Sequence, residues 1–142
     1  MQDKPIIELI SHIHLTNKRY LENKISAKGL SIKQYFLLKI LKNRNLTPSD
    51  ISEMLYADRP TTTVIINNLM KKGFINKEAN PTDSRSKIIS ISKTGQQKLQ
   101  EFKDLEKEKI KATSCLDKQE KQSLKELLLK VSNNLQKQIY AE

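Results

Sequence analysis

The sequence predicts a mainly α-helical fold that contains one short β-hairpin. Apolar residues recur at helical spacing through most of the chain, which is typical of amphipathic helices packed around a core. Only residues 74–92 depart from this pattern, with two short runs rich in Ile and Phe on either side of a polar, turn-rich stretch. The 3 glycines and 4 prolines punctuate the chain sharply, and several mark expected helix ends.

The N-terminal residues predict a long helix, because Ile6, Ile13 and Ile25 belong to an apolar repeat that ends before Gly29. Ser31 is the expected N-cap of the next helix. That helix carries apolar residues on more than one side, which is typical of a helix at the centre of a core.

A short helix is expected next, with Thr47 as N-cap, Pro48 at its first position and Asp50 as the capping-box acid. A further helix begins near Pro60 and ends at Gly73, a suitable C-terminal residue. One of its faces is expected to point inward and carries Thr62, Ile65, Ile66 and Leu69. The opposite face carries Thr61, Val64, Asn68 and Lys71, with Thr63 and Asn67 on the flanks.

Two short strands, "FINKE" and "KIISIS", are expected around the loop "ANPTDSRS". Thr94 then starts a helix whose apolar repeat runs through Phe102 to Ile110. Asp117 and Glu120 are expected to cap the last helix. The apolar seam of that helix consists of Leu124, Leu127, Leu128, Val131, Leu135 and Ile139.

This order of elements predicts a winged helix-turn-helix with long N- and C-terminal dimerisation helices. Residues 31–95 are expected to form the winged helix-turn-helix DNA-binding domain, and residues 1–30 and 96–142 the dimerisation helices. The small central domain cannot cover the apolar stripes of the long helices. A second copy of the chain is the most economical partner, so we expect a homodimer.

Basic charge is concentrated around the predicted motif. Residues 59–100 hold 8 basic and 2 acidic residues, so +6 of the total +10 lies in less than a third of the chain. A generally lysine-rich chain would spread its charge evenly, as the nearly balanced residues 101–142 do. A focused basic field attracts polyanions, and the expected partner is double-stranded DNA.

Other classes of protein find little support. The single cysteine, Cys115, excludes an internal disulfide and favours a reducing compartment. The N-terminus does not resemble a signal peptide, and no apolar run is long enough to span a membrane, so a cytoplasmic protein with no membrane partner is expected. No catalytic motif and no metal-ligand cluster is apparent, since His12 and His14 point in different directions on a helix. We expect no enzyme, no metal and no cofactor.

The segments "TPSDISEML", "PTTTVIINNLMKKGFI" and "DSRSKIISISKTGQQKL" together resemble the MarR family of bacterial transcription regulators. The resemblance covers nearly the whole chain. Its most specific part is the wing triplet Asp83-Ser84-Arg85, followed by a strand and "KTG". The resemblance implies a homodimer joined through its terminal helices on a pseudo-palindromic operator. Family members usually repress, and many release DNA on binding a small molecule or on cysteine oxidation.

The second helix of the motif would enter the major groove, where Thr61 and Thr63 could bond phosphates or base edges. The alternative is local, because hydroxyls often satisfy free N–H groups of a first helical turn. Val64 stands where relatives often carry arginine, and Asn67 and Asn68 suit adenine, so we expect an A/T-rich operator. The asparagines could equally face water or phosphate.

Phosphate contacts are expected from a set of basic residues on the motif and wing: Arg59, Lys71, Lys72, Lys77 and Lys87. By resemblance, Arg85 enters the minor groove, with Asp83 holding its guanidinium through paired hydrogen bonds. The alternative is a surface ion pair of little energetic value.

Three further interpretations remain open. The chain could be a winged-helix protein-interaction module, a co-regulator or anti-repressor without specific DNA binding, although the basic motif region argues against it. Cys115 could sense oxidants or fill space near the dimer seam. A small-molecule effector is possible, and the cleft that relatives use for it could be lined here by His14, Tyr20, Tyr35 and Phe36.

Overall fold

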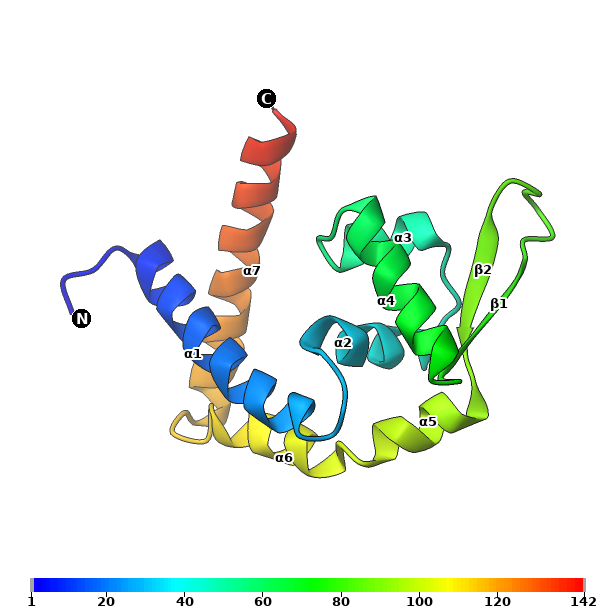
Figure 1. Ribbon diagram of the computed structural model, residues 1–142. Helices are drawn as coiled ribbons and strands as arrows, with labels where there is room; N and C mark the ends of the chain where they lie inside the picture. Colours follow the sequence, from blue (N-terminus) through cyan, green and yellow to red (C-terminus); the bar gives the residue numbers. More distant parts are fainter. Residues whose placement is uncertain (1, 142) are drawn as a thin grey trace. The chain divides into compact units, whose positions relative to one another are not determined.

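The computed structural model describes residues 2–141, apart from the side chain of Lys109. It confirms the mainly helical fold with one hairpin (Figure 1). The elements, in order, are α1 (Ile6–Ser26), α2 (Ile32–Leu41), α3 (Pro48–Met54), α4 (Arg59–Lys71), β1 (Ile75–Ala79), β2 (Lys87–Ile91), α5 (Lys93–Gln100), α6 (Lys103–Lys111) and α7 (Lys118–Tyr140).

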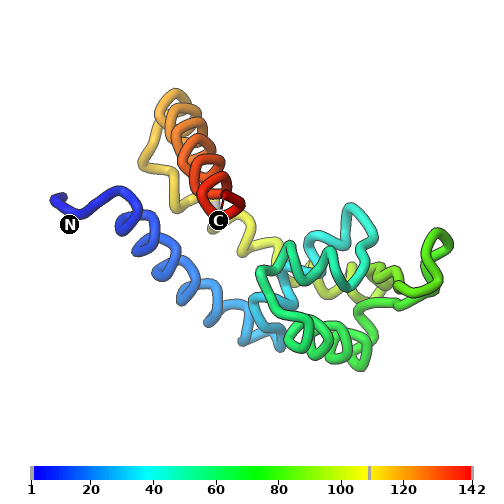
Figure 2. Tube along the Cα trace, turned by 90° about the horizontal axis from the view of Figure 1, so that it is seen from above, coloured from blue at the N-terminus to red at the C-terminus, as the bar shows by residue number. Residues whose placement is uncertain are grey.

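The chain forms two compact units, one up to Lys103 and the other from Asp104 onward, the latter coloured yellow to red in Figure 2. The first unit contains α1 together with the whole winged motif. The division of the chain by function, into residues 31–95 and the flanking helices, stays a prediction.

Helix α2 lies at the centre of the first unit, as its apolar pattern predicts. Ser31 begins it with a capping box, in which the Ser31 hydroxyl accepts the Gln34 N–H at 3.2 Å and the Gln34 side chain accepts the Ser31 N–H at 3.0 Å. The helix contacts α1, α4, α5 and β2. Its buried apolar residues are Tyr35, Leu37, Leu38 and Leu41.

Helices α3 and α4 form the helix-turn-helix. The predicted capping box of α3 is present, with the Thr47 hydroxyl accepting the Asp50 N–H at 3.2 Å and Asp50 accepting the Thr47 N–H at 2.9 Å. Helix α4 ends at Lys71, and Gly73 follows its C-cap with a φ of +73°, which is strained for any residue with a side chain. The N–H of Gly73 bonds to the Met70 carbonyl at 2.9 Å and that of Phe74 to the Leu69 carbonyl at 3.0 Å, which is a Schellman motif.

Strands β1 and β2 form an antiparallel hairpin that projects away from the helices of its unit (Figure 1). Its register pairs Ile75 with Ile91 and Ala79 with Lys87. Leu46 adds a bridge to Ile89 through two backbone hydrogen bonds of 3.0 and 2.7 Å. The buried Ile75 and Ile89 anchor the base of this wing to the core.

The single helix predicted from Thr94 to Ile110 is wrong. Two helices occur instead, because the chain turns at Glu101 and Phe102, whose N–H groups bond to carbonyls three residues earlier at 3.2 and 3.1 Å. This turn lets Phe102 enter the core, where its ring centroid lies 4.9 Å from that of Tyr35. The apolar repeat is real, but burial of one aromatic ring interrupts the helix that carries it.

Helix α5 begins one residue earlier than predicted, at Lys93, with Ser92 as its N-cap. The Ser92 hydroxyl accepts the Gly95 N–H at 3.0 Å and donates to the Gly73 carbonyl at 2.6 Å. Gly95 is packed against the hairpin so closely that a Cβ there would lie 2.1 Å from the Phe74 carbonyl oxygen. The glycine of "KTG" is therefore required by a close approach of α5 to the backbone.

In the second unit, Asp117 and Glu120 form the predicted capping box of α7, with bonds of 2.8 and 2.9 Å. The six residues of the predicted seam on this helix are all exposed in the single chain. Helix α1 likewise exposes Ile6, Leu9, Ile13 and Tyr20. Within residues 2–141, no helix has both the length and the apolar character needed to cross a lipid bilayer.

Candidate nucleic-acid interface

Helix α4 presents the two faces that the sequence predicts. Thr62, Ile65, Ile66 and Leu69 are buried, and Thr62 is only 2% exposed. Every residue that we expected to face a ligand on this helix is exposed: Arg59, Thr61, Thr63, Val64, Asn67, Asn68 and Lys71.

The N-terminus of α4 is capped by Asp58, which the sequence analysis missed although an Asp just before Arg-Pro is a usable signal. Its carboxylate accepts the Thr61 N–H at 2.7 Å. The hydroxyl and N–H of Thr61 lower the pKa of Asp58 below its ordinary value of 3.8, and the positive charge of Lys33 adds a smaller lowering. The threonines are therefore not the caps of this helix.

The three consecutive threonines have different bonds. The Thr62 hydroxyl donates to the Asp58 carbonyl at 2.8 Å and accepts from the Ser52 hydroxyl at 2.8 Å, which links α3 to α4. The Thr63 hydroxyl donates to the Arg59 carbonyl at 3.0 Å, so its oxygen remains an acceptor on the exposed side. Thr62 thus has a structural role, and Thr61 and Thr63 stay candidates for binding.

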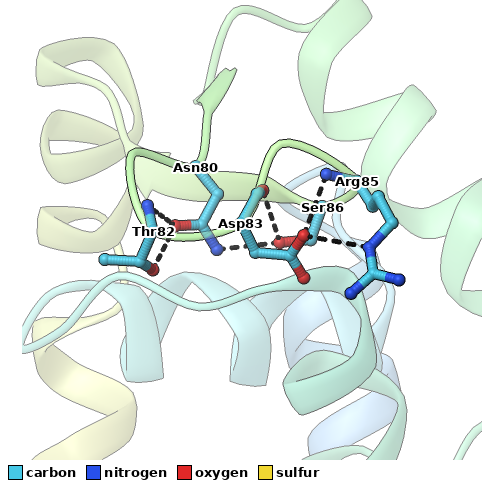
Figure 3. A network of polar contacts seen from close by, with 5 residues as sticks. All are labelled: Asn80, Thr82, Asp83, Arg85 and Ser86. Atoms are coloured by element: carbon cyan, nitrogen blue, oxygen red, sulfur yellow. Dashed lines mark hydrogen bonds and ion pairs between the residues drawn. The ribbon is translucent and has the colours of Figure 1, made fainter.

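The loop of the wing is ordered by its own side chains (Figure 3). The Asn80 amide oxygen accepts from the Thr82 N–H at 3.1 Å and the Thr82 hydroxyl at 2.9 Å, while its amide nitrogen donates to Ser86 at 2.8 Å. The backbone N–H of Ser86 donates to the Asp83 carbonyl at 3.2 Å. These bonds fix the turn that carries Asp83 and Arg85.

The predicted paired hydrogen bonds between Asp83 and the Arg85 guanidinium are wrong in detail. One carboxylate oxygen of Asp83 accepts both the Arg85 backbone N–H at 3.0 Å and its Nε at 3.4 Å (Figure 3). A separation of two residues in a tight turn places the carboxylate over the backbone, so it reaches only the near side of the guanidinium. The Arg85 side chain is 92% exposed, which leaves its far edge for an external partner.

A groove of about 330 Å³ lies between the N-terminal ends of α3 and α4 and the wing. It brings together basic residues that are far apart in the sequence, namely Arg59, Lys77, Arg85 and Lys87, with Thr63 beside them. No acidic residue is among the described residues that line it. The remaining lining is mostly hydroxyl groups for which the sequence predicts no role at DNA, and it consists of Thr47, Pro48, Ser49, Ser52, Thr62 and Ser86.

The other expected binding residues lie outside this groove on the exposed face of α4: Thr61, Val64, Asn67, Asn68 and Lys71. Lys72 is exposed as well, and its role at phosphate stays a prediction. Its ammonium donates to the Gly29 carbonyl at 2.8 Å and so ties the end of α4 to the turn after α1.

A second hollow, of about 530 Å³, lies between α1, α2 and the C-terminal end of α3. Of the residues considered for an effector cleft, His14 and Phe36 line it, but Tyr20 and Tyr35 do not. Tyr35 is 1% exposed and packs against Phe102 instead, which is why an aromatic on a central helix is a poor predictor of a cleft.

Cys115 is exposed in the single chain, and its place at a dimer seam stays a prediction. Among the residues that the structure describes, no group of three or more His, Cys, Asp and Glu side chains is arranged to hold a metal ion.

Comparison with known proteins agrees with this geometry. The model of the MarR family matches residues 30–87. The HTH-type transcriptional regulator BilQ of Clostridioides difficile (strain CD3) is 30% identical over 106 residues, which are 74% of this chain and 72% of that protein.

Two solved structures share the fold. The complex of S. aureus MepR with DNA has a TM-score of 0.82 at 23% identity, covering 93% of this chain and 99% of that one. A mutant of E. coli MarR complexed with operator DNA has a TM-score of 0.74 at 24% identity, covering 89% of this chain and 93% of that one.

Proposed function

The chain belongs to the MarR family of transcription regulators, and from this premise we propose that it is a homodimeric repressor of a pseudo-palindromic, A/T-rich operator. Release from the operator follows the binding of a small molecule or another signal. Members of this family are DNA-binding regulators and not enzymes, which agrees with the absence of a catalytic motif in the sequence.

The basic groove is the observation that carries this proposal. Arg59 at the start of α4 and Arg85 and Lys87 on the wing line one hollow with no acidic neighbour in its described lining. Their positive charges would attract the phosphates of a DNA strand that passes between α4, the proposed recognition helix, and the wing. Phosphate contacts of this kind fix the position and register of a protein on a duplex.

Base recognition is assigned to the exposed face of α4. Thr61 and Val64 offer methyl groups for thymine, and Asn67 and Asn68 offer amides that suit adenine. Val64 is 57% exposed, so its methyl groups are accessible to a partner on this face. No arginine is available on this face beyond Arg59, so we expect A·T pairs beneath the middle of the helix.

Arg85 is assigned to the minor groove. Its exposed guanidinium sits at the tip of a wing whose loop is held by internal hydrogen bonds. A preorganised arginine gains most where A-tracts narrow the minor groove and strengthen its negative potential. The MepR and MarR mutant structures named above both contain DNA, which shows that this fold accommodates a duplex.

The dimer is supported by the exposed apolar rows on α1 and α7. A row such as Leu124, Leu128, Val131 and Leu135 would leave a large apolar surface in water if the chain stayed monomeric. Two copies paired through these helices would present two recognition helices to successive major grooves, about 34 Å apart.

The test is a selection of binding sites from a random duplex library at near-physiological salt. We expect an enriched palindrome with A·T pairs under α4. Salt must be controlled, because phosphate contacts alone give an affinity that falls steeply as salt rises.

Purely salt-sensitive binding without enrichment would contradict a specific repressor and favour the protein-interaction alternative. An indispensable G·C pair under the middle of α4 would contradict the roles of Val64, Asn67 and Asn68. Reporter expression from the enriched site, with and without the protein, then distinguishes repression from activation.

A further inference from the structure

The turn that follows α1 is bonded to the C-terminal end of α4. The Lys72 ammonium donates to the Gly29 carbonyl at 2.8 Å, although 43 positions of the chain separate the two residues. The turn itself is fixed, because the Gly29 N–H bonds to the Ser26 carbonyl at 2.9 Å and Leu30 is buried in the core. Lys72 therefore joins α4 to a well-defined point at the end of α1.

The same turn is bonded to the end of α5. The Lys28 ammonium donates to the carbonyl of Glu101, which is the C-cap of α5. It also lies 5.3 Å from the centroid of the Phe102 ring, within the range of a cation–π attraction. Phe102 is buried, so Lys28 contacts a partner whose position the core fixes.

Helices α4 and α5 are joined to each other as well. The Ser92 hydroxyl at the start of α5 donates to the Gly73 carbonyl at 2.6 Å. Near the end of α5, Lys98 pairs with the Glu101 carboxylate at 2.5 Å, and its ammonium lies 6.0 Å from the centroid of the Phe74 ring. These contacts close a circuit that runs from the turn after α1, through the end of α4 and along α5, back to the turn. We call this circuit the lysine network, after its members Lys28, Lys72 and Lys98.

The lysine network holds the end of α4 that is farther from the basic groove. Helix α4 has 13 residues and leads into the hairpin (Figure 1), so its two ends are about 18 Å apart. Its N-terminal half carries Thr61 and Val64, to which base recognition is assigned. A tilt of about 10° around the C-terminal end would move the N-terminal end by roughly 3 Å, which is close to the rise of one base pair. A small change at the network is therefore large enough to shift the register on DNA.

Helix α1 connects the network to the proposed dimer. It is the terminal helix that lies in the same compact unit as the winged motif, and it carries an exposed apolar row. The tilt of α4 relative to α1 would therefore set the distance between the recognition helices of two paired copies. In a two-fold dimer each tilt occurs twice, so its effect on that distance is doubled.

We propose that the lysine network fixes the tilt of α4 relative to α1, and that Lys28 and Lys72 are positioning residues which set the spacing of half-sites that the dimer accepts. Lys72 acts through the Gly29 carbonyl, and Lys28 acts through the end of α5. The proposal rests on the proposed function, since only a dimeric DNA-binding regulator reads two half-sites.

The first experiment measures the restraint on α4 without DNA. Amide hydrogen exchange is followed by NMR at Gly73 and Phe74, whose N–H groups bond to carbonyls of α4. The double variant Lys28→Met, Lys72→Met keeps the apolar stems and removes both ammonium groups. We expect exchange at these amides to rise on the order of tenfold with little change in thermal unfolding. Lys42→Met, which removes a charge from the exposed C-cap of α2, is the control and should change exchange less than about twofold.

Unchanged exchange at Gly73 and Phe74 in the double variant would overturn the restraint. A general rise that includes a core amide such as Leu38 would overturn it too, because the substitutions would then loosen the whole unit.

The second experiment measures spacing on the operator found by selection, with the spacer between its half-sites lengthened or shortened by one base pair. The wild type should prefer the selected spacing on the order of tenfold, because half-site separation follows from the geometry of the dimer. The double variant should keep its affinity for an isolated half-site and prefer the selected spacing by less than about threefold. Lys42→Met should behave like the wild type.

An unchanged spacing preference in the double variant would overturn the proposal. A reduced salt dependence in Lys72→Met with unchanged spacing preference would also overturn it, since Lys72 would then be a phosphate contact. A wild-type chain that selects no palindrome would instead contradict the proposed function, and hydrogen exchange would still decide whether the network restrains α4.

Discussion

At the scale of single residues, a substitution of Arg85 on the wing should affect DNA binding without affecting folding. Arg85 is 92% exposed and its contacts with Asp83 are within two residues, so the fold does not depend on its guanidinium. Its neighbours in the loop hold the backbone without it, through Asn80 and Ser86 (Figure 3).

Arg85→Ala is expected to weaken operator binding on the order of tenfold or more with unchanged thermal unfolding, because a minor-groove contact is lost and no packing is. The operator affinity of Arg85→Lys should lie between those of the wild type and Arg85→Ala, since lysine keeps the charge but lacks the planar guanidinium. Arg19→Ala on α1 is the charge-matched control. Equal affinities of Arg85→Ala and the wild type in a fluorescence anisotropy titration would remove Arg85 from the interface.

Thr62 is a polar residue whose hydrogen bonds are all to other residues of the chain, so it is expected to affect stability and not DNA binding directly. Thr62→Val keeps the buried shape but removes the hydroxyl that joins Ser52 to the Asp58 carbonyl. We expect a loss of about 1 kcal/mol in the free energy of unfolding, measured by urea denaturation. Thr63→Val, whose hydroxyl bonds only to Arg59 one turn back on its own helix, should unfold like the wild type. The reverse order of stabilities would contradict this division of roles.

At the scale of elements, helix α5 and the hairpin are held together by a close backbone approach. Gly95→Ala would place a Cβ 2.1 Å from the Phe74 carbonyl oxygen, so either α5 or the wing must shift. We expect a destabilisation of roughly 2 kcal/mol or more, together with weaker operator binding because the wing moves. Gln97→Ala, exposed on the same helix, should change neither quantity. If Gly95→Ala were as stable as the wild type in the same denaturation series, the close contact between α5 and the Phe74 carbonyl would not be required by the fold.

The caps of α3 and α4 make the winged motif sensitive to acid. Hydrogen bonds from the backbone and side chain of Thr47 lower the pKa of Asp50, and the hydroxyl and N–H of Thr61 lower that of Asp58. A carboxyl with a lowered folded pKa contributes stability above its unfolded value of 3.8, and that stability is lost as pH falls through the folded pKa.

The double variant Asp50→Asn, Asp58→Asn keeps an acceptor at each position but cannot titrate. As pH falls below the ordinary carboxyl pKa of 3.8, its free energy of unfolding should therefore fall less steeply than that of the wild type. The measurement is a set of urea unfolding curves at several pH values. Parallel pH profiles for the two proteins would assign the acid sensitivity to other groups.

At the scale of the whole molecule, the long helices decide whether the winged motif acts alone or in pairs. Leu128→Glu places a charge in the exposed apolar row of α7, and we expect a monomer with much weaker operator binding. Leu129→Glu is the matched control, since Leu129 is also exposed but lies about 100° around the helix from Leu128. Sedimentation velocity gives the result, and dimers of both variants would exclude this row as the interface.

Local signals in the sequence were sufficient for most elements. Helix caps act within a few residues of one another, so they can be predicted from the sequence alone. Examples are Ser31, Thr47, Asp117 and the glycine after α4, Gly73. The alternation of buried and exposed positions on α4 follows from helical geometry, and the predicted outward residues are exposed. Of the candidate site, the identities of the basic residues could be predicted in this way, and their roles at DNA stay predictions.

The rest depended on contacts between distant parts of the chain. No local pattern could show that the helix would break so that Phe102 packs on Tyr35, or that the Lys72 ammonium would bond to the Gly29 carbonyl. Nor could it show that the hydroxyls at the start of α3 share a groove with Arg85. The sequence by itself determined most of the elements and the family, because caps, periodicity and the wing triplet are short-range. Only the tertiary structure decided which charges meet in one groove, because that depends on how α3, α4 and the hairpin pack on α2.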